Sequence, residues 1–506
     1  MQKLFFIIIH LSFIFFFTIS LSHAKTIAPI KIQDNTVWSK KESPYIVNDD
    51  IIVDKNASLT IEPGVEIIFT FNKNSFSRFI VKGSLIAKGK ENELISFKSS
   101  QIKAGSWGGI VFDSPDKTQS VIEYCRITDS RCAIACFQAS PIIKNNILTN
   151  NEVAIVCENH SSPSIISNTI TNNGIAEIYP SAVHCTLWSN PVIQKNIIEN
   201  NYGHAIYCEV YSSPLISGNK IGSLLGANVV CLSFSNPKII NNDITQGTSE
   251  FGIILYHSSP QIFENQISNK RLYGITSVYS TPDISKNIFY KNYIGIYCIR
   301  SSPIISENDI SHCDIALTLA DFSHPQIKEN YTSFNGIETK SLRNQINDTC
   351  ISSDIQHNIK FLNTIEKKPL IIFRSFSEGS WDIGLLDGLT LTQTMLTKNS
   401  FHNGSAVWSP DGKSIAFTSY RDNNWDIFIM DSSGGNTRNL TNTPFIKEEA
   451  PPIWSPNGKK LAFERETPEC QTVIMDLDTK QINKIDLKNI NIEYPGLYPL
   501  VFIWIP

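Results

Sequence analysis

Glu158, His184, Tyr207, Glu209 and Tyr297 stand at two neighbouring positions of a repeat of about 22 residues. Paired carboxylates can cleave a glycosidic bond, and aromatic rings can pack on a sugar. Two coils of a stacked fold separate the glutamates by about 9.6 Å, the upper limit for an inverting glycosidase. Because no acid–base partner accompanies them, we assign no catalytic residue and predict these five as ligand contacts.

The histidines and methionines do not indicate a metal site. His160 and His257 share a repeat position but lie four coils apart, about 19 Å, which is too far for one ion. The chain has 4 Met, too few for a cluster of soft copper ligands. We therefore predict neither a metal nor another cofactor.

Six cysteines each follow an apolar residue by two positions, so both members of each pair face the same side of a strand. They are Cys136, Cys157, Cys185, Cys208, Cys231 and Cys298. Zinc needs convergent ligands, whereas this column is linear. We expect a column of buried free thiols in place of disulfides or a zinc site.

The elements that must position these residues come from a phrase, Pro-x-Ile-x-x-Asn-x-Ile, that returns nine times between Pro141 and Thr332. Isoleucine stands two residues after each proline without exception. Five residues after each proline stands an asparagine, which we predict to form a structural ladder: Asn146, Asn168, Asn196, Asn219, Asn242, Asn265, Asn287, Asn308 and Asn330.

This period is too short for two packed helices and is typical of three short strands joined by tight turns, as in a parallel β-helix. Asparagine tolerates the left-handed backbone of a sharp corner, and its amide can donate to one coil and accept from another. The sequence therefore predicts an all-β solenoid with isoleucine and asparagine columns along its axis.

Three motifs carry a family resemblance: Ala57 to Val65, Trp107-Gly108-Gly109-Ile110, and the repeats themselves. Together they resemble the right-handed parallel β-helix superfamily of pectate-lyase-like and NosD-like periplasmic proteins. The resemblance implies a right-handed solenoid, which we place at 51–340 after a lead-in at 25–50. It is specific for the fold and not for an activity.

One outward column of this solenoid is mainly apolar and aromatic: Ala135, Val156, His184, Tyr207, Val230, Ile254, Thr276, Tyr297 and Thr318. It holds neither a carboxylate nor an arginine. Such a stripe is usually covered or used. Either it docks an extended glycan or protein through Tyr207 and Tyr297, or flanking loops or the C-terminal region cover it.

A second period, of 44 residues, follows a predicted cap and linker at 341–368. Trp408-Ser409-Pro410-Asp411-Gly412 and its later copy closely resemble the repeats of TolB-like periplasmic propellers, whose blades have four strands. About three blades fit into 369–506, fewer than a closed ring needs. A truncated reading frame, packing on the end of the β-helix, and completion by a homo-oligomer remain as explanations.

Residues 1–24 read as a secretory signal, with Lys3, an apolar run and a small-x-small cleavage site. We expect a mature chain that starts at Lys25, has no transmembrane segment, and is periplasmic or secreted. A net charge of -4 without a basic stripe argues against nucleic acid.

We therefore predict an exported, non-catalytic binding protein whose partner is a polysaccharide or an envelope protein. The TolB-like resemblance implies that the C-terminal repeats serve protein contacts. A polysaccharide lyase, hydrolase or epimerase on the β-helix is the main alternative, because residues in the turns could supply acid–base groups. A structural protein of the cell envelope is the second alternative.

Overall fold

The computed structural model describes residues 25–72, 76–113, 119–174, 181–320, 322–342, 359–360, 370–377, 380–387, 390–398, 401–443, 446, 448, 452–455, 457–465 and 471–484. The predicted signal at 1–24, most of the predicted linker at 341–368 and everything after Lys484 lie outside them. Within the described residues, the regular secondary structure is strand except for one 3-10 helix, η1 (Lys40–Glu42).

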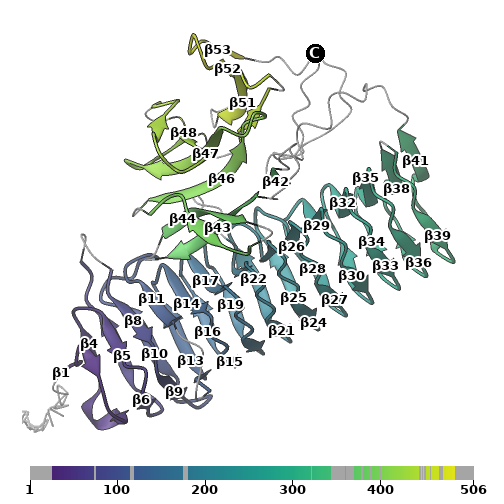
Figure 1. Ribbon diagram of the computed structural model, residues 1–506. Coiled ribbons are helices and arrows are strands. Elements are labelled where there is room, and N and C mark those ends of the chain that lie inside the picture. The colour runs from purple at the N-terminus through teal and green to yellow at the C-terminus, as the bar shows by residue number, and fades with distance from the viewer. Residues whose placement is uncertain are drawn as a thin grey trace, which may run out of the picture.

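Residues 26–342 form a solenoid of three parallel sheets (Figure 1). Sheet A contains β1 (Thr26–Ile27), β4 (Tyr45–Val47), β7 (Glu66–Phe69), β10 (Ile95–Ser99), β13 (Cys125–Thr128), β16 (Ile147–Thr149), β19 (Thr169–Thr171), β22 (Ile197–Asn201), β25 (Lys220–Ser223), β28 (Asp243–Gly247), β31 (Gln266–Ser268), β34 (Ile288–Tyr290), β37 (Asp309–Ser311) and β40 (Tyr331–Ser333).

Sheet B contains β2 (Lys31–Ile32), β5 (Ile51–Val53), β8 (Arg78–Val81), β11 (Gly109–Asp113), β14 (Cys132–Phe137), β17 (Val153–Glu158), β20 (Val183–Cys185), β23 (Ile206–Cys208), β26 (Val229–Leu232), β29 (Phe251–Tyr256), β32 (Tyr273–Val278), β35 (Ile294–Ile299), β38 (Ile315–Ala320) and β41 (Ile337–Leu342). Its first two strands begin the stack, and the first complete coil lies within the predicted lead-in at 25–50.

Sheet C contains β3 (Thr36–Trp38), β6 (Ser58–Ile61), β9 (Ser84–Lys88), β12 (Val121–Glu123), β15 (Ile142–Lys144), β18 (Ser164–Ile166), β21 (Val192–Gln194), β24 (Leu215–Ser217), β27 (Lys238–Ile240), β30 (Gln261–Phe263), β33 (Asp283–Ser285), β36 (Ile304–Ser306) and β39 (Gln326–Lys328). Equivalent residues of successive coils pair in register, for example Ile216 with Ile239. The isoleucine column therefore lies inside the solenoid, where Ile216 and Ile239 are fully buried.

The asparagine column forms a continuous ladder, as Asn219 illustrates. Its Oδ1 accepts the backbone N–H of Asn196 at 2.9 Å and the Nδ2 of Asn196 at 3.0 Å. Its own Nδ2 donates to the carbonyl of Ile193 and to Oδ1 of Asn242, both at 2.9 Å. Each buried amide therefore satisfies backbone groups of neighbouring coils that the turn would otherwise leave unpaired.

A second asparagine ladder, which we did not predict, runs through Asn151, Asn173 and Asn201 and resumes at Asn292. Lys270 stands in this column, where its backbone N–H donates to Oδ1 of Asn292 at 3.1 Å. Its Nζ donates to the carbonyl of Gln246 at 3.2 Å. Burial lowers the pKa of Lys270 to about 8.

Replacing Lys270 by asparagine is expected to stabilise the solenoid by about 2 kcal/mol at pH 7, because it removes a buried cation and continues the ladder. The folded-state pKa is depressed, so the wild-type chain loses stability as pH falls from about 10.5 to about 8, and the variant does not. Chemical denaturation at pH 7 and pH 10 measures this difference. Exposed Lys238→Asn is the control, and an equal gain there would contradict the account.

The nine described cysteines are free and buried, as predicted for the column. Cys136, Cys157, Cys185, Cys208 and Cys231 pair across five successive strands of sheet B. Burial raises the pKa of Cys298 to about 12, as expected for a thiol in an apolar interior.

After the solenoid come three four-stranded antiparallel sheets, which Figure 1 shows above the solenoid. C-terminal sheet 1 contains β42 (Ile359–Lys360), β43 (Leu370–Ser377), β44 (Ser380–Asp387) and β45 (Gln393–Met395). C-terminal sheet 2 contains β46 (His402–Trp408), β47 (Ser414–Arg421), β48 (Asn424–Asp431) and β49 (Arg438–Asn439). C-terminal sheet 3 contains β50 (Ile453–Trp454), β51 (Lys460–Arg465), β52 (Gln471–Asp476) and β53 (Ile482–Lys484). Within the described ranges, no helix has the length and apolar character needed to cross a membrane.

Candidate functional site

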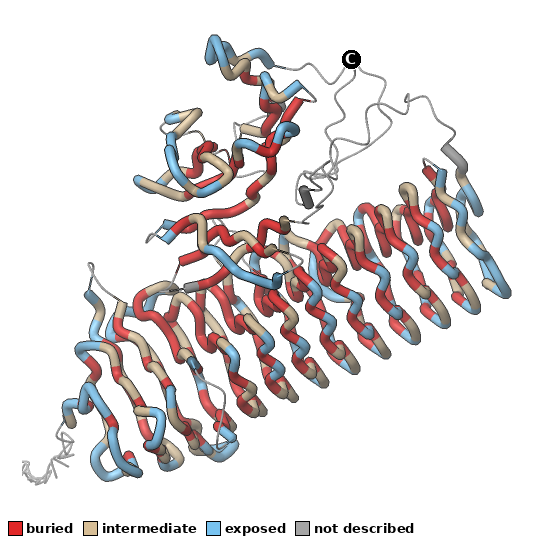
Figure 2. The backbone as a smooth tube through the Cα atoms, viewed as in Figure 1, coloured by how far each residue is buried: buried red, intermediate tan, exposed pale blue. Residues whose placement is uncertain are grey.

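Most of the predicted ligand contacts meet at one junction, where C-terminal sheet 1 lies on the outward face of sheet B. Figure 1 shows β43 and β44 directly above β14 and β17, and Figure 2 shows buried backbone on both sides of this contact. The contact answers one of the questions that the sequence left open. C-terminal sheet 1 packs on the side of the solenoid and not on its end.

Glu158 and Glu209 bind the edge of β43. The backbone N–H of Phe376 donates to Oε2 of Glu158 at 3.1 Å, and the hydroxyl of Ser375 donates to Oε1 of the same carboxylate. The backbone of Arg374, two residues earlier on β43, donates to Glu209. Both glutamates are buried. The pair of carboxylates therefore satisfies strand-edge donors of the chain's own C-terminal region.

His184 lies between a hydroxyl and a carboxylate. Its Nδ1 is 3.1 Å from Oγ of Ser181, and its Nε2 is 3.0 Å from Oε1 of Glu209. Burial lowers the pKa of His184, so the ring is neutral at pH 7, and its Nε2–H donates to the ionised Glu209. Nδ1 then accepts from Ser181. The three residues form a linear chain of hydrogen bonds beneath C-terminal sheet 1.

Aromatic rings and one guanidinium close the junction from above. The Trp381 ring lies 4.5 Å from the His184 ring, tilted by 53°, and the Tyr207 ring stacks on His184 at 5.0 Å. The Arg374 guanidinium lies 5.2 Å from the ring centroids of both Tyr207 and Trp381. A cation held between two aromatic faces is stabilised by their quadrupoles.

The apolar part of the junction shows what covers the first face of C-terminal sheet 1. Ile371, Phe373 and Leu386 pack on Leu187 and Val210 at a corner of the solenoid. In the next copy of the 44-residue repeat, the positions of Ile371, Phe373 and Leu386 are occupied by Ile415, Phe417 and Met430. These three residues pack on C-terminal sheet 1. The solenoid therefore covers the face of C-terminal sheet 1 that a preceding blade would cover.

Protonation at the junction is set by burial and by Arg374. Burial raises the pKa of Glu158 to about 7, against the opposing effect of its hydrogen bonds from Ser375 and Phe376. Burial acts in the same direction on Glu209, but the hydrogen bond from His184 and the charge of Arg374 outweigh it and lower the pKa of Glu209. Burial and the charge of Arg374 lower the pKa of His204 to about 4.

Replacing Glu158 by glutamine is expected to remove one pH dependence of the junction. The folded-state pKa of Glu158 is raised, so its stabilisation is complete below about pH 4.5 and is lost as pH rises to about 7. A neutral amide can accept from Phe376 and donate to Ser375 at every pH. Relative to the wild type, the variant should gain on the order of 2 kcal/mol between pH 4.5 and pH 7.5.

Hydrogen exchange of β43 and β44 at these two pH values measures the gain. Glu264→Gln, at an exposed solenoid corner, is the control. Parallel pH profiles for the wild type and Glu158→Gln would contradict a protonated Glu158.

The last predicted contact, Tyr297, lies apart from the junction. It is buried in an apolar cluster on sheet B with Val230, Ile254 and Tyr273, and its ring lies 4.9 Å from that of Tyr273. The structure thus brings together Glu158, His184, Tyr207 and Glu209 but not Tyr297. We did not predict Ser181, Arg374, Ser375 or Trp381, because they are far apart in sequence and share no repeat position with the rest.

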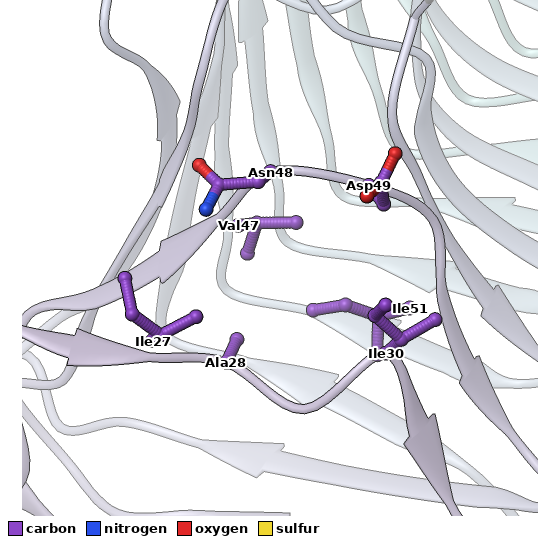
Figure 3. Close-up of a pocket in the computed structure, with 7 residues that line it drawn as sticks. All are labelled: Ile27, Ala28, Ile30, Val47, Asn48, Asp49 and Ile51. Carbon is purple, nitrogen blue, oxygen red and sulfur yellow. The ribbon is translucent and has the colours of Figure 1, made fainter.

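The junction has the groups of an acyl-transfer or glycosidase site but not the access. Ser181, His184 and Glu209 repeat the order of a nucleophile, base and acid, yet all three are buried. Within the described residues, no group of three or more His, Cys, Asp and Glu side chains could hold a metal ion. A cavity of about 110 Å³ at the N-terminal end is lined mainly by Ile and Ala, with Asn48 and Asp49 (Figure 3). It lies away from the junction.

Several solved structures are similar to parts of this chain. A TolB from Acinetobacter baumannii is 24% identical over 25% of this chain and 31% of its own, with a TM-score of 0.21. A putative TolB from Agrobacterium tumefaciens is 21% identical over 23% of this chain and 44% of its own, with a TM-score of 0.21. The periplasmic alginate epimerase AlgG is 15% identical over 57% of this chain and 77% of its own, with a TM-score of 0.34.

The chain spans less than half of the length of either TolB protein. No protein of curated function matches it. A model of the TolB β-propeller domain matches residues 366–499, and one of the pectate-lyase-like β-helix domain matches 30–119. The model of the right-handed β-helix region matches 83–224 and 227–368, together more than half of the 506 residues. The chain therefore belongs to the family of right-handed β-helix proteins and carries a TolB-type propeller region at its C-terminal end.

Proposed function

We propose that the protein is an exported, non-catalytic binding protein of the bacterial cell envelope. In this proposal the solenoid is a rigid support for an extended partner, and C-terminal sheets 2 and 3 serve protein contacts. One observation supports it above all: Glu158 and Glu209, the carboxylates best spaced for chemistry, are buried as hydrogen-bond acceptors of β43. The apolar leader at 1–24 supports export.

The alternative, a polysaccharide-active enzyme, is favoured by one observation. The two carboxyl groups differ in pKa, since the pKa of Glu158 is raised and that of Glu209 is lowered. An acid and a base need this difference. Burial beneath β43 opposes the alternative, because a sugar chain could reach the pair only if C-terminal sheet 1 moved away.

The purified full chain tests both. It is incubated with neutral polysaccharides and with polyuronates, and new reducing ends, unsaturated uronate products and inverted uronate centres are measured. We expect no turnover of either class of polysaccharide. Turnover that disappears in Glu158→Gln or Glu209→Gln, but not in Glu264→Gln, would replace this proposal with the enzyme.

A further inference from the structure

A ladder of aromatic rings runs along the solenoid corner that follows sheet B. The ring of Trp188 lies 5.5 Å from that of Tyr211, which lies 5.4 Å from Phe234. The stack continues through His257 to Tyr279, with centroids 6.1 Å and then 5.2 Å apart. The rings of the Trp188–Tyr211 pair are within 4° of parallel. One ring is therefore presented per coil over these five successive coils, and His160 extends the stack by one coil, 5.4 Å from Trp188.

The backbone conformation of this corner is unfavourable for aromatic residues. All five have a positive φ, from 47° at Tyr279 to 65° at Phe234. Bulky side chains are disfavoured in this left-handed region, which asparagine and glycine tolerate. Another corner of the same coils uses asparagine there, as in Asn150, Asn172 and Asn200. The turn therefore does not require aromatic side chains, and their presence indicates a use.

A second column, of hydroxyl and amide groups, runs beside the ladder. It lies two residues after each ring, beyond a buried serine, and its members are exposed: Asn190, Ser213, Asn236, Ser259 and Thr281. Its members are joined from coil to coil, since the backbone N–H of Ser213 donates to Oδ1 of Asn190 and that of Asn236 to Oγ of Ser213. Neither column holds lysine or arginine between Trp188 and Thr281.

The ladder remains partly open although C-terminal sheet 1 lies beside it. Trp188 and Phe234 pack against the apolar cluster that contains Ile371 and Met395, and both are half-buried. Tyr211 between them is 37% exposed. Rings of this kind offer apolar edges and polar tips to a chain that lies along the solenoid axis.

We infer that this ladder binds an extended, uncharged polysaccharide, with the rings against its carbon–hydrogen edges and the second column at its hydroxyls. A polyuronate is not the expected ligand, because neither column offers its carboxylates a lysine or arginine between Trp188 and Thr281, and Arg300 follows only one coil beyond Tyr279, 5.7 Å from its ring centroid. The inference deepens the proposed function and rests on it: it names the partner of the solenoid and moves the contact from Tyr207 and Tyr297, which are covered, to the neighbouring corner.

The test measures binding of the full chain to a soluble neutral glucan and to alginate as the polyuronate, by calorimetry. Wild type should bind the glucan and not the alginate. Tyr211→Asn removes the ring but keeps a residue that tolerates a φ of 59°, and should weaken binding about tenfold. Tyr211→Phe should retain it.

Tyr290→Asn is the matched control, because Tyr290 is also 37% exposed but lies at another corner of the solenoid. Binding of alginate in preference to glucan, or equal glucan binding by Tyr211→Asn and the wild type, would overturn the inference. Loss of binding in both asparagine variants would do so as well. The turnover assay is independent of these variants, so a ladder that binds nothing is distinguishable from an enzyme.

Discussion

Glu209→Ala is expected to release C-terminal sheet 1 from the solenoid while the solenoid stays folded. The substitution leaves Nε2–H of His184 and the backbone N–H of Arg374 without their acceptor, and it removes the negative charge that faces the Arg374 guanidinium. Removing one partner of a buried charged contact lowers the stability of that contact by about 3 kcal/mol or more, because the remaining groups stay buried and unpaired.

Region-resolved hydrogen exchange measures this release. Amides of β43 and β44 should lose protection, whereas those of sheet A should keep it. Glu264→Ala, at an exposed corner, is the control and should change protection by less than about 0.5 kcal/mol. If β43 keeps wild-type protection in Glu209→Ala, the polar contacts of the junction are not what holds the sheet.

Asn219→Ala is expected to cost the solenoid about 3 to 4 kcal/mol. The side chain makes four hydrogen bonds with two neighbouring coils and with the carbonyl of Ile193, and it is buried. Each such bond contributes about 1 kcal/mol net, and the donors left behind cannot reach water. Chemical denaturation followed by circular dichroism measures the loss.

Asn330→Ala is the matched control at the last rung of the same ladder. Asn330 accepts from the backbone N–H and Nδ2 of Asn308, but it is only half-buried, so water can replace part of its bonding. We expect a loss below about 1 kcal/mol. Equal losses at the two positions would show that burial does not govern the strength of the ladder.

The repeat predicted the solenoid because its physics is local to one coil. Isoleucine two residues after each proline fixes the inward face, and the in-register pairing then aligns Ile216 with Ile239 and Asn219 with Asn242. The all-β solenoid was predicted from such spacings, whereas its right-handedness and the TolB-type region were predicted from the resemblance of their motifs to known families. The second ladder escaped because its asparagines are interrupted, first by Ser223 after Asn201 and later by Lys270 before Asn292.

The junction could not be predicted in the same way. Ser375 and Glu158 are 217 residues apart, and their contact depends on how two separately folded regions meet. The sequence predicted that Glu158, His184, Tyr207 and Glu209 point outward from their coils, and they do. They are nevertheless buried or, in the case of Tyr207, half-buried, because C-terminal sheet 1 covers that face of the coils. Cover by the C-terminal region was one of the two alternatives left open for this stripe.

The contact of Ile371, Phe373 and Leu386 with the solenoid fixes which end of the row of C-terminal sheets is anchored. One flank of the row is already occupied, so duplication of the 44-residue unit can lengthen it only from C-terminal sheet 3 outward. Such growth would produce an arc anchored at one end, whose reach is set by the number of units, and each added unit would leave the anchoring residues untouched.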